Sequence, residues 1–316
     1  MNLLFYSAAD NGPEWLAALS RAFPAARLQS WPHLPDDATP AASLQNIDYA
    51  LLWKPPPRLL RELGSVKAIF NLGAGIDTLS GIESVPAGVP IVRVEDAGMA
   101  EQMGEYVVHA VLRQYREFDT YAEAQRAGTW RALARQDKRT FGVGILGIGV
   151  LGTAVAAALQ PFGFPLAGWS RTRKSVTGID SYAGRAELDS FLARCRVLVC
   201  LLPLTRETRG LLDRRALSCL PVGAHVINVA RGALIVDADL LALLDEGRLG
   251  SATLDVFRDE PLPPAHAFWH HPRISVTPHV SAVTLVEESV AQIAAKIAGL
   301  EAGLPITGIV DRERDY

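Results

Sequence analysis

Short apolar runs alternate with longer segments of helical periodicity along most of the chain. In the N-terminal part, the apolar runs predict strands at 2–7, 48–53, 67–72 and 91–94. A second series predicts strands at 142–147, 165–169, 197–202, 224–229, 251–255 and 274–277. Strands that alternate with helices favour parallel sheets covered by helices on both faces. The pattern therefore predicts an α/β fold.

The spacing of these elements predicts two domains in the 316 residues. A long helix predicted at about 100–119 separates the two series of strands. Near the C-terminus, one apolar stripe recurs at helical spacing and comprises Val286, Val290, Ile293, Ile297 and Leu300. No strand is predicted after this helix, so we expect it to pack back on the first domain. The expected domains are residues 1–99 with 284–316, and residues 100–283, each a doubly wound parallel sheet.

Residues 141–170 contain no charged residue and no histidine, so hydropathy alone would indicate a membrane helix. The segment also holds seven glycines and two prolines. Parallel strands that are covered on both faces have the same uncharged, apolar composition. We therefore interpret the segment as part of a buried sheet and expect no membrane partner.

Composition narrows the class of protein further. The hydrophobic share is 49%, the charged share is 21% and the net charge is −3. Neither the overall composition nor the net charge of the chain favours binding to nucleic acid. The three cysteines, Cys195, Cys200 and Cys219, form no paired framework and fit buried thiols in a reducing cytoplasm. Three histidines cluster in "HAFWHH", but no acidic or thiol ligand completes a set, so we expect no metal site.

A glycine-rich loop is the first candidate for chemistry. In "FGVGILGIGVLG" a predicted strand runs into a G-x-G-x-x-G motif that opens a helix and comprises Gly147, Ile148, Gly149, Val150, Leu151 and Gly152. Gly147 permits a tight turn, Gly149 lets the backbone approach a pyrophosphate, and Gly152 lets helix and strand pack closely. The helix N-terminus favours that phosphate with its unpaired N–H groups. The motif predicts a dinucleotide site.

The stretch "WSRTRK" indicates which dinucleotide binds. Sites for NAD usually carry an acidic residue on the ribose 2′-OH at the end of the next strand, but here Ser170 and Arg171 follow it. A serine and an arginine suit a 2′-phosphate, and Arg173 and Lys174 add positive charge. A solvated basic turn is the structural alternative. We expect NADP(H) to be preferred over NAD(H).

Three further strand ends carry polar residues in apolar surroundings. Arg231 follows one strand, Asp255 and Glu260 follow the next, and His279 follows the last. Ligands of doubly wound sheets bind beyond the carboxyl ends of the strands. Reduction of a 2-oxo acid needs a cation for the carboxylate, a proton donor and an acid that keeps the donor protonated. Arg231, His279 and Glu260 match these needs.

Each of these residues also fits a purely structural role. Arg231 fits the cap of a strand, His279 a loop residue with satisfied hydrogen bonds, and Glu260 a solvated turn acid whose neighbour Asp259 competes for the same role. Their placement after successive strands of one sheet favours the catalytic interpretation.

The segments "GILGIGVLG", "NVARGALIVDADLLALLDEGRL", "LDVFRDEPLP" and "TPHVSA" together resemble the D-isomer-specific 2-hydroxyacid dehydrogenases. "LLWKPP", "FNLGAGID" and "WSRTRKS" are similar to the members that reduce glyoxylate and hydroxypyruvate. The resemblance implies a homodimer of two-domain subunits, with a Rossmann-type cofactor domain, a flavodoxin-like substrate domain and a cleft between them. It implies reduction of small 2-oxo acids with NADPH, glyoxylate to glycolate and hydroxypyruvate to glycerate. The arginine, acid and histidine of the family fall on Arg231, Glu260 and His279.

The resemblance also implies a substrate loop at Gly73, Ala74 and Gly75, and a pocket tryptophan at Trp53. The two glycines expose amide groups after a predicted strand, as an anion-binding nest would, although an ordinary turn or, for Trp53, core packing fits too. We assign four more residues to the cofactor site: Pro203, Thr208, Ala230 and Asp255. Asp255 fits a buried acid at a strand end equally well.

Two other functions fit parts of the pattern. One is NAD-linked oxidation of a D-2-hydroxy acid, which Ser170 and Arg171 disfavour. The other is a non-enzymatic, nicotinamide-sensing protein that resembles corepressors on the same scaffold. Turnover with each cofactor on several 2-oxo acids discriminates among the three.

Overall fold

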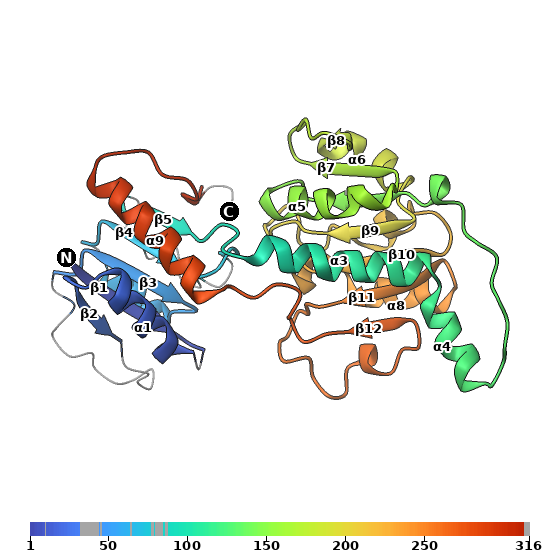
Figure 1. The fold of residues 1–316 in the computed structure, drawn as a ribbon, viewed down its shortest axis with the longest axis horizontal. Helices are drawn as coiled ribbons and strands as arrows, with labels where there is room; N and C mark the ends of the chain where they lie inside the picture. Colours follow the sequence, from blue (N-terminus) through green and yellow to red (C-terminus); the bar gives the residue numbers. More distant parts are fainter. Residues whose placement is uncertain are drawn as a thin grey trace. The chain divides into compact units, whose positions relative to one another are not determined.

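The computed structural model describes residues 1–316 except 10, 32–43, 45, 64, 77–78, 80–84, 86–87 and 313–316. The chain divides into two compact units (Figure 1). The discontinuous unit comprises Met1–Gly98 and Thr284–Tyr316, and the continuous unit comprises Met99–Val283. Each unit is described separately below.

The discontinuous unit is built on a five-stranded parallel sheet of order β2-β1-β3-β4-β5. Its strands are β1 (Asn2–Ser7), β2 (Arg27–Ser30), β3 (Tyr49–Trp53), β4 (Ala68–Asn71) and β5 (Ile91–Arg93). Its helices are α1 (Gly12–Ala22), α2 (Pro57–Glu62) and α9 (Val286–Glu301). The order is that of flavodoxin-like folds.

Two apolar cores cover the two faces of this sheet. Side chains of α1 and α9 share one core with β1, β3 and β4, and side chains of α2 contribute to the other. The apolar stripe predicted for the C-terminal helix lies in the first core, from Val286 to Ile297, with Leu300 packed against it. The expectation that this helix packs back on the N-terminal sheet is confirmed.

The continuous unit carries a seven-stranded parallel sheet of order β12-β11-β10-β9-β6-β7-β8. Its strands are β6 (Val143–Leu146), β7 (Leu166–Ser170), β8 (Asp180–Ala183), β9 (Val197–Cys200), β10 (Ala224–Asn228), β11 (Leu249–Leu254) and β12 (Ile274–Val276). The strand order reverses at β6, which pairs with β7 on one side and β9 on the other. Such a reversal is the point at which doubly wound sheets bind their ligands.

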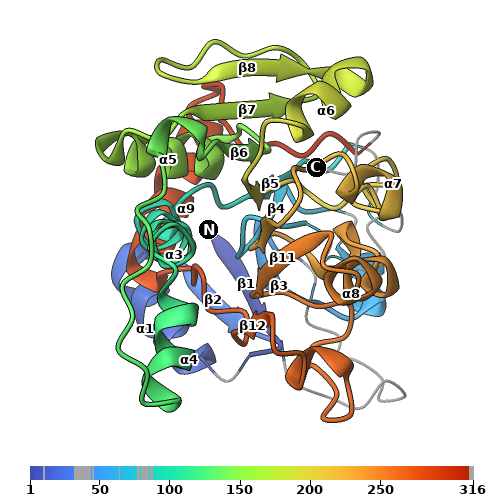
Figure 2. The same cartoon turned by 90° about the vertical axis from the view of Figure 1, so that its right-hand side faces the viewer.

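Helices cover both faces of this sheet (Figure 2). On one face lie α3 (Met99–Tyr115) and α5 (Val150–Leu159), and on the other lie α6 (Gly184–Leu192), α7 (Arg214–Leu217) and α8 (Asp237–Asp245). Along β9, Val197 and Val199 face the first layer and Leu198 and Cys200 the second. Burial on both faces explains the uncharged composition of residues 141–170. In the part of the chain that the structure describes, no helix has the length and apolar character needed to span a bilayer.

The elements differ from the sequence prediction in three places. Two strands were not predicted, β2 and β8, because both are edge strands with polar, partly exposed residues and no apolar run. The single helix expected at about 100–119 is instead two helices, α3 and α4 (Phe118–Arg126), because Glu117 has a left-handed backbone with φ of 55°. Short 3₁₀ turns complete the unit at η2 (Lys138–Thr140), η3 (Gln160–Phe162), η4 (Gly232–Leu234) and η5 (Ala267–Trp269).

The cysteines and the histidine cluster have ordinary structural surroundings. Cys195 and Cys200 are buried thiols, as expected, whereas Cys219 is only partly buried, and all three are free. In "HAFWHH", the His271 ring lies 3.3 Å from a carboxylate oxygen of Asp245. Within the described ranges, no three His, Cys, Asp or Glu side chains are grouped as metal ligands would be.

Candidate active site

The glycine loop joins β6 to α5 at the strand reversal. Gly147 has φ of 116°, and a Cβ at this position would lie 2.8 Å from the backbone carbonyl carbon of Leu201. Gly149 is the N-cap of α5, and its Cβ position has nothing within 4 Å. A Cβ on Gly152 would overlap the Gly147 carbonyl. The loop therefore presents open backbone N–H groups at a helix N-terminus, an arrangement that fits the pyrophosphate of a dinucleotide.

The basic stretch follows β7 and is tied to the rest of the unit. The buried Ser170 donates its hydroxyl hydrogen to the carbonyl of Thr172, at 2.7 Å. Arg173 pairs with Glu187 of α6, and the ammonium of Lys174 donates to the carbonyl of Ile148, inside the glycine loop, at 2.7 Å. Arg171 lies exposed between them. These contacts order the stretch, and its basic side chains at 171–174 are exposed, so both the phosphate site and the solvated basic turn fit the structure.

The next strand ends carry the remaining residues predicted for the cofactor. After β9, the Pro203 carbonyl accepts a hydrogen bond of 2.7 Å from the hydroxyl of Thr208. After β10, the N–H of Ala230 donates to the side-chain oxygen of the buried Asn228 at 3.2 Å. These contacts order both turns at the carboxyl edge of the sheet, beside the glycine loop in strand order.

Arg231 lies three residues after the end of β10 and is partly exposed. Its guanidinium donates to the carbonyl of Ala230 at 2.7 Å, and its own carbonyl accepts from Asn228 at 3.0 Å. The charge of Arg231 is the smallest of the effects that lower the pKa of the Glu260 carboxyl, after its hydrogen bonds and the charge of His279. The structure thus places a cation near the predicted acid, both of them at strand ends of one sheet.

Glu260 and His279 form a hydrogen-bonded pair, with Nδ1 of the histidine 2.8 Å from Oε2 of the glutamate. The other carboxylate oxygen accepts the N–H of Phe257 at 3.0 Å. Burial raises the pKa of the Glu260 carboxyl, but the hydrogen bonds from His279 and Phe257 and the nearby positive charges outweigh burial, so its pKa lies below the ordinary value. Of the two acids in "RDEP", it is Glu260 that contacts the histidine.

Asp255, which directly follows β11, is completely buried. One carboxylate oxygen accepts the hydroxyl of Thr277 at 2.6 Å and the N–H of Val280 at 2.9 Å. The other oxygen accepts the N–H of Ser281 at 2.8 Å. These contacts match the alternative that the sequence left open, a buried acid at a strand end, and they organise the segment that carries His279.

In the discontinuous unit, the loop after β4 holds the predicted substrate residues. The ring of Trp53, at the end of β3, lies so close to Gly73 that a Cβ there would be 2.9 Å from a ring carbon. The side chain of Asn71, fully buried at the end of β4, donates to the carbonyls of Gly73 and Gly75 at 2.8 and 3.0 Å. These two hydrogen bonds fix the carbonyls of Gly73 and Gly75 and so order the loop that carries the predicted substrate residues.

Sequence reasoning missed three residues that shape these sites: Asn71, Thr277 and Tyr106 of α3. The hydroxyl of Tyr106 lies 2.6 Å from that of Thr277. For Asn71 the usable signal was a polar residue at the end of an apolar strand run. For Thr277 it was the position two residues before the predicted histidine. No local pattern marks Tyr106, because its partner is 171 residues away.

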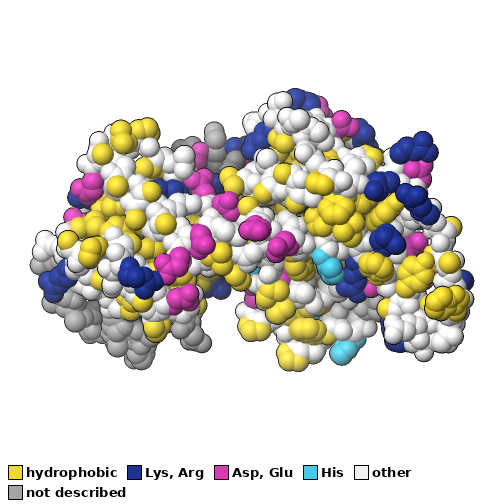
Figure 3. Space-filling view, in the orientation of Figure 1, with side chains coloured by type: hydrophobic (Ala, Val, Ile, Leu, Met, Phe, Trp, Pro, Cys, Tyr) yellow, Lys and Arg dark blue, Asp and Glu magenta, His cyan; other side chains and the backbone are white. Residues whose placement is uncertain are grey.

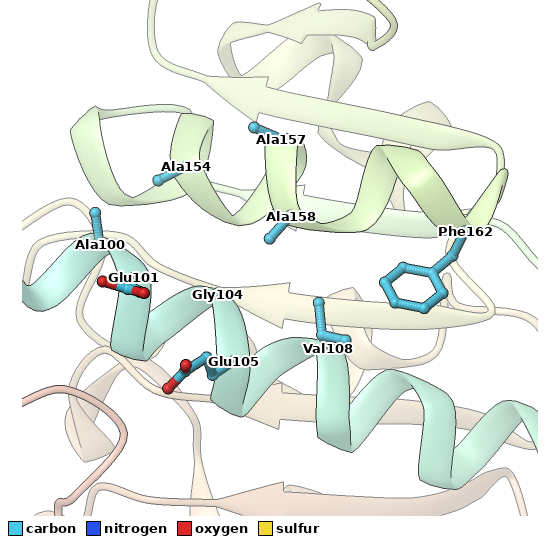
Figure 4. A pocket seen from close by; sticks show the side chains of 9 residues that line it. All are labelled: Ala100, Glu101, Gly104, Glu105, Val108, Ala154, Ala157, Ala158 and Phe162. Atoms are coloured by element: carbon cyan, nitrogen blue, oxygen red, sulfur yellow. The ribbon is translucent and has the colours of Figure 1, made fainter.

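An open pocket of about 450 Å³ lies between α3 and α5. Figure 4 shows Ala158 of α5 projecting toward α3, opposite Gly104, with Glu101 and Glu105 on α3 among the lining residues. A Cβ on Gly104 would be 3.1 Å from Ala158, so the helices pack closely along one side of the pocket. The residues that line it differ from those predicted for the active site.

Comparison with known proteins defines the class. The model of the NAD-binding domain of D-isomer specific 2-hydroxyacid dehydrogenases matches residues 108–281. The match covers the glycine loop, the basic stretch, Arg231, Glu260 and His279. The chain belongs to the D-isomer specific 2-hydroxyacid dehydrogenase family.

Individual relatives extend this assignment over the whole chain. Glyoxylate/hydroxypyruvate reductase A of Serratia proteamaculans (strain 568) is 46% identical over an alignment of 316 positions that covers 98% of this chain and 98% of that one. A D-isomer specific 2-hydroxyacid dehydrogenase from Xanthobacter autotrophicus Py2, solved with NADPH and MES, has a TM-score of 0.93 and 39% identity over 100% of this chain and 99% of that one. The NADPH-dependent glyoxylate/hydroxypyruvate reductase from Sinorhizobium meliloti, solved with NADP and sulfate, has a TM-score of 0.88 and 36% identity over the same shares.

Proposed function

We propose that the protein reduces small 2-oxo acids with NADPH, glyoxylate to glycolate and hydroxypyruvate to glycerate. The observation that carries the proposal is the hydrogen-bonded pair of His279 and Glu260 at the carboxyl edge of the sheet that also holds the glycine loop. The relatives from Serratia proteamaculans and Sinorhizobium meliloti are named for this activity.

The continuous unit is the cofactor domain in this proposal. The N–H groups at Gly149, Val150, Leu151 and Gly152 bind the pyrophosphate, and Arg171 binds the 2′-phosphate. Ser170 supports the turn, because its hydroxyl hydrogen is already donated to Thr172. Lys174 adds positive charge while it holds the glycine loop. The bound dinucleotide supplies a hydride to the carbonyl carbon of the 2-oxo acid.

The protein's own side chains bind the substrate and move the proton. The loop amides of Gly73, Ala74 and Gly75 and the guanidinium of Arg231 bind the carboxylate, and Arg231 polarises the carbonyl. As the carbonyl oxygen gains charge, Nε2 of His279 donates its proton to it, because Nδ1 is held by Glu260. The carboxylate of Glu260 stabilises the imidazolium before transfer.

A panel of substrates and cofactors tests the proposal. Initial rates with NADPH and NADH are measured on glyoxylate, hydroxypyruvate, pyruvate and phenylpyruvate. We expect turnover of the first two and preference for NADPH. Better rates with NADH in the oxidative direction would instead indicate an NAD-linked dehydrogenase, and binding of NADPH without turnover of any 2-oxo acid would indicate a sensor.

Two substitutions test the assigned roles. His279→Ala should lower kcat by about a hundred- to ten-thousand-fold, the usual contribution of a general acid, and leave NADPH binding intact. Arg171→Ala should weaken NADPH at least about tenfold and NADH little, because only NADPH carries the 2′-phosphate. Arg215→Ala is the matched control, since this exposed arginine of the same unit pairs with Asp189 on another helix. Equal losses for both cofactors in Arg171→Ala would refute the phosphate assignment.

We also propose that the protein is a cytoplasmic homodimer that pairs through α4 and the segment after it. Phe118, Tyr121 and Trp130 are exposed there, Trp130 completely, and Figure 3 shows apolar side chains on this surface. Exposed aromatic side chains are enriched at protein interfaces. Light scattering should give twice the chain mass, and Trp130→Ser should shift the protein toward monomer. A wild-type protein that stays monomeric at micromolar concentration would refute the pairing.

A further inference from the structure

The backbone of His279 has an unusual conformation. Its φ is 56°, in the left-handed region that only a few per cent of non-glycine residues occupy, asparagine, aspartate and histidine more often than the others. Such a conformation persists only where surrounding contacts determine it. Here the N–H of His279 donates to the Asp255 carbonyl at 2.8 Å, and the two following N–H groups donate to the Asp255 carboxylate.

A chain of two hydroxyl groups leads from helix α3 to the same carboxylate. Thr277 donates its hydroxyl hydrogen to Oδ1 of Asp255 at 2.6 Å. A threonine hydroxyl has one hydrogen, so the Tyr106 hydroxyl, 2.6 Å from that of Thr277, acts as the donor to it. The resulting order of donors is Tyr106 to Thr277 to Asp255.

This chain acts directly on the segment that carries the histidine. The Oδ1 atom that accepts from Thr277 also accepts from Val280, one residue after His279. The carbonyl of Thr277 also accepts the N–H of His279 at 3.1 Å. The main-chain carbonyl of Thr277 thus holds the N–H of His279. The side chain of Thr277 holds the Asp255 carboxylate, which in turn orients the two residues after His279.

We propose that Tyr106 and Thr277 are positioning residues that hold His279 in the geometry required for proton transfer. The proposal rests on the proposed function, in which His279 is the proton donor. Neither residue touches the reacting atoms in this proposal. Their effect passes through Asp255 and the backbone of residues 279–281.

The charged groups around this chain are few and identifiable. Glu260 faces the His279 ring, and Arg231 acts on Glu260. Asp255 faces Thr277, and the charges of Asp255 and Arg113 both act on Tyr106. Burial, chiefly, raises the pKa of Tyr106, so its hydroxyl keeps its hydrogen across the working pH range.

Tyr106→Phe is the first test, because it removes the hydroxyl and keeps the ring. We expect kcat to fall about tenfold, the NADPH dissociation constant to stay within about twofold, and the limb of the kcat–pH profile that reports His279 to move. Tyr115→Phe is the matched control: the same change on the same helix, at a tyrosine whose hydroxyl donates to the Gln136 carbonyl. The control should leave kcat and the pH profile unchanged.

The conservative variant at Thr277 separates positioning from packing. Thr277→Val keeps the shape and removes the donor, so it should lower kcat at least as much as Tyr106→Phe. Thr277→Ser restores the hydroxyl and should recover most of kcat. Thermal unfolding of each variant shows whether it is folded. Loss of kcat in Thr277→Ser equal to that in Thr277→Val, or a fall in kcat with an unmoved pH profile, would overturn the proposal.

A double variant separates this inference from the proposed function. If Tyr106 acts through His279, adding Tyr106→Phe to His279→Ala should cause no further fall in the residual rate. A multiplied loss would overturn the inference, as would wild-type kcat in Tyr106→Phe when His279→Ala is inactive. Full activity of His279→Ala itself would mean that the proposed role of His279 fails.

Discussion

The glycine loop allows one prediction to be worked out quantitatively, because Gly147 and Gly149 are needed for different reasons. In Gly147→Ala, the added Cβ lies 2.8 Å from two backbone atoms, where ordinary contact begins at 3.4 Å, and φ is 116°. The conformation costs about 1–3 kcal/mol and the overlap about another 1–3 kcal/mol. At about 2–4 °C per kcal/mol for a unit of this size, Tm should fall by roughly 5–20 °C.

Gly149→Ala should show the opposite behaviour. Its φ of −92° suits alanine and its Cβ position is open. Alanine is a poorer N-cap than glycine, which lowers the free energy of unfolding by about 0.5–1 kcal/mol. Alanine also restricts the unfolded chain, which raises that free energy by a similar amount. Stability should therefore stay nearly unchanged. The new methyl group, however, lies where the pyrophosphate must approach, and losing one charge-assisted hydrogen bond of about 1.5–3 kcal/mol weakens binding about 10- to 150-fold.

Differential scanning calorimetry without cofactor and titration calorimetry with NADPH and NADH measure both effects. Gly149→Ala should weaken both cofactors equally, because both contain the pyrophosphate. Wild-type affinity in that variant would refute the close approach of phosphate to this backbone. An unchanged Tm in Gly147→Ala would refute the steric argument.

Three further predictions concern other residues. Asn71→Ala should raise KM for the 2-oxo acid about tenfold and leave the NADPH dissociation constant unchanged, because the carbonyls of the substrate loop lose their donor; an unchanged KM would count against the nest. In Glu260→Gln the imidazolium loses its carboxylate, so the pH above which kcat/KM on glyoxylate declines should be lower than in the wild type. A profile that does not move would contradict the pairing. Burial lowers the pKa of His225 to about 4 from 6.5, so between these values the unfolded chain binds a proton that the folded chain does not. The free energy of unfolding, measured by urea titration, should therefore fall as the pH falls between these values. The slope is about 1.4 kcal/mol per pH unit and the total is up to about 3 kcal/mol. The variant His225→Gln should lose this part of the pH dependence.

Local sequence was sufficient where a feature depends on neighbours in the chain. Buried parallel strands are apolar on both faces, so the runs at 142–147 and 197–202 marked β6 and β9. The glycine spacing marked the loop before α5, because a tight turn and a close approach each exclude a side chain within a few residues. The edge strands β2 and β8 lacked such a signal, since partly exposed edges tolerate polar residues.

Contacts between distant residues were decided only by the tertiary structure. The residue pattern left Asp259 as a competitor of Glu260 and the family resemblance favoured Glu260, but the contact itself, of Glu260 with His279, is visible only in the folded turn. The sequence marked four residues of "WSRTRK" for a phosphate, whereas the fold engages Arg173 with Glu187 and Lys174 with the glycine loop. The choice of partner depends on the distance between side chains brought together by the sheet, and hydrogen bonds act only over about 3 Å, so no pattern along the chain could supply it.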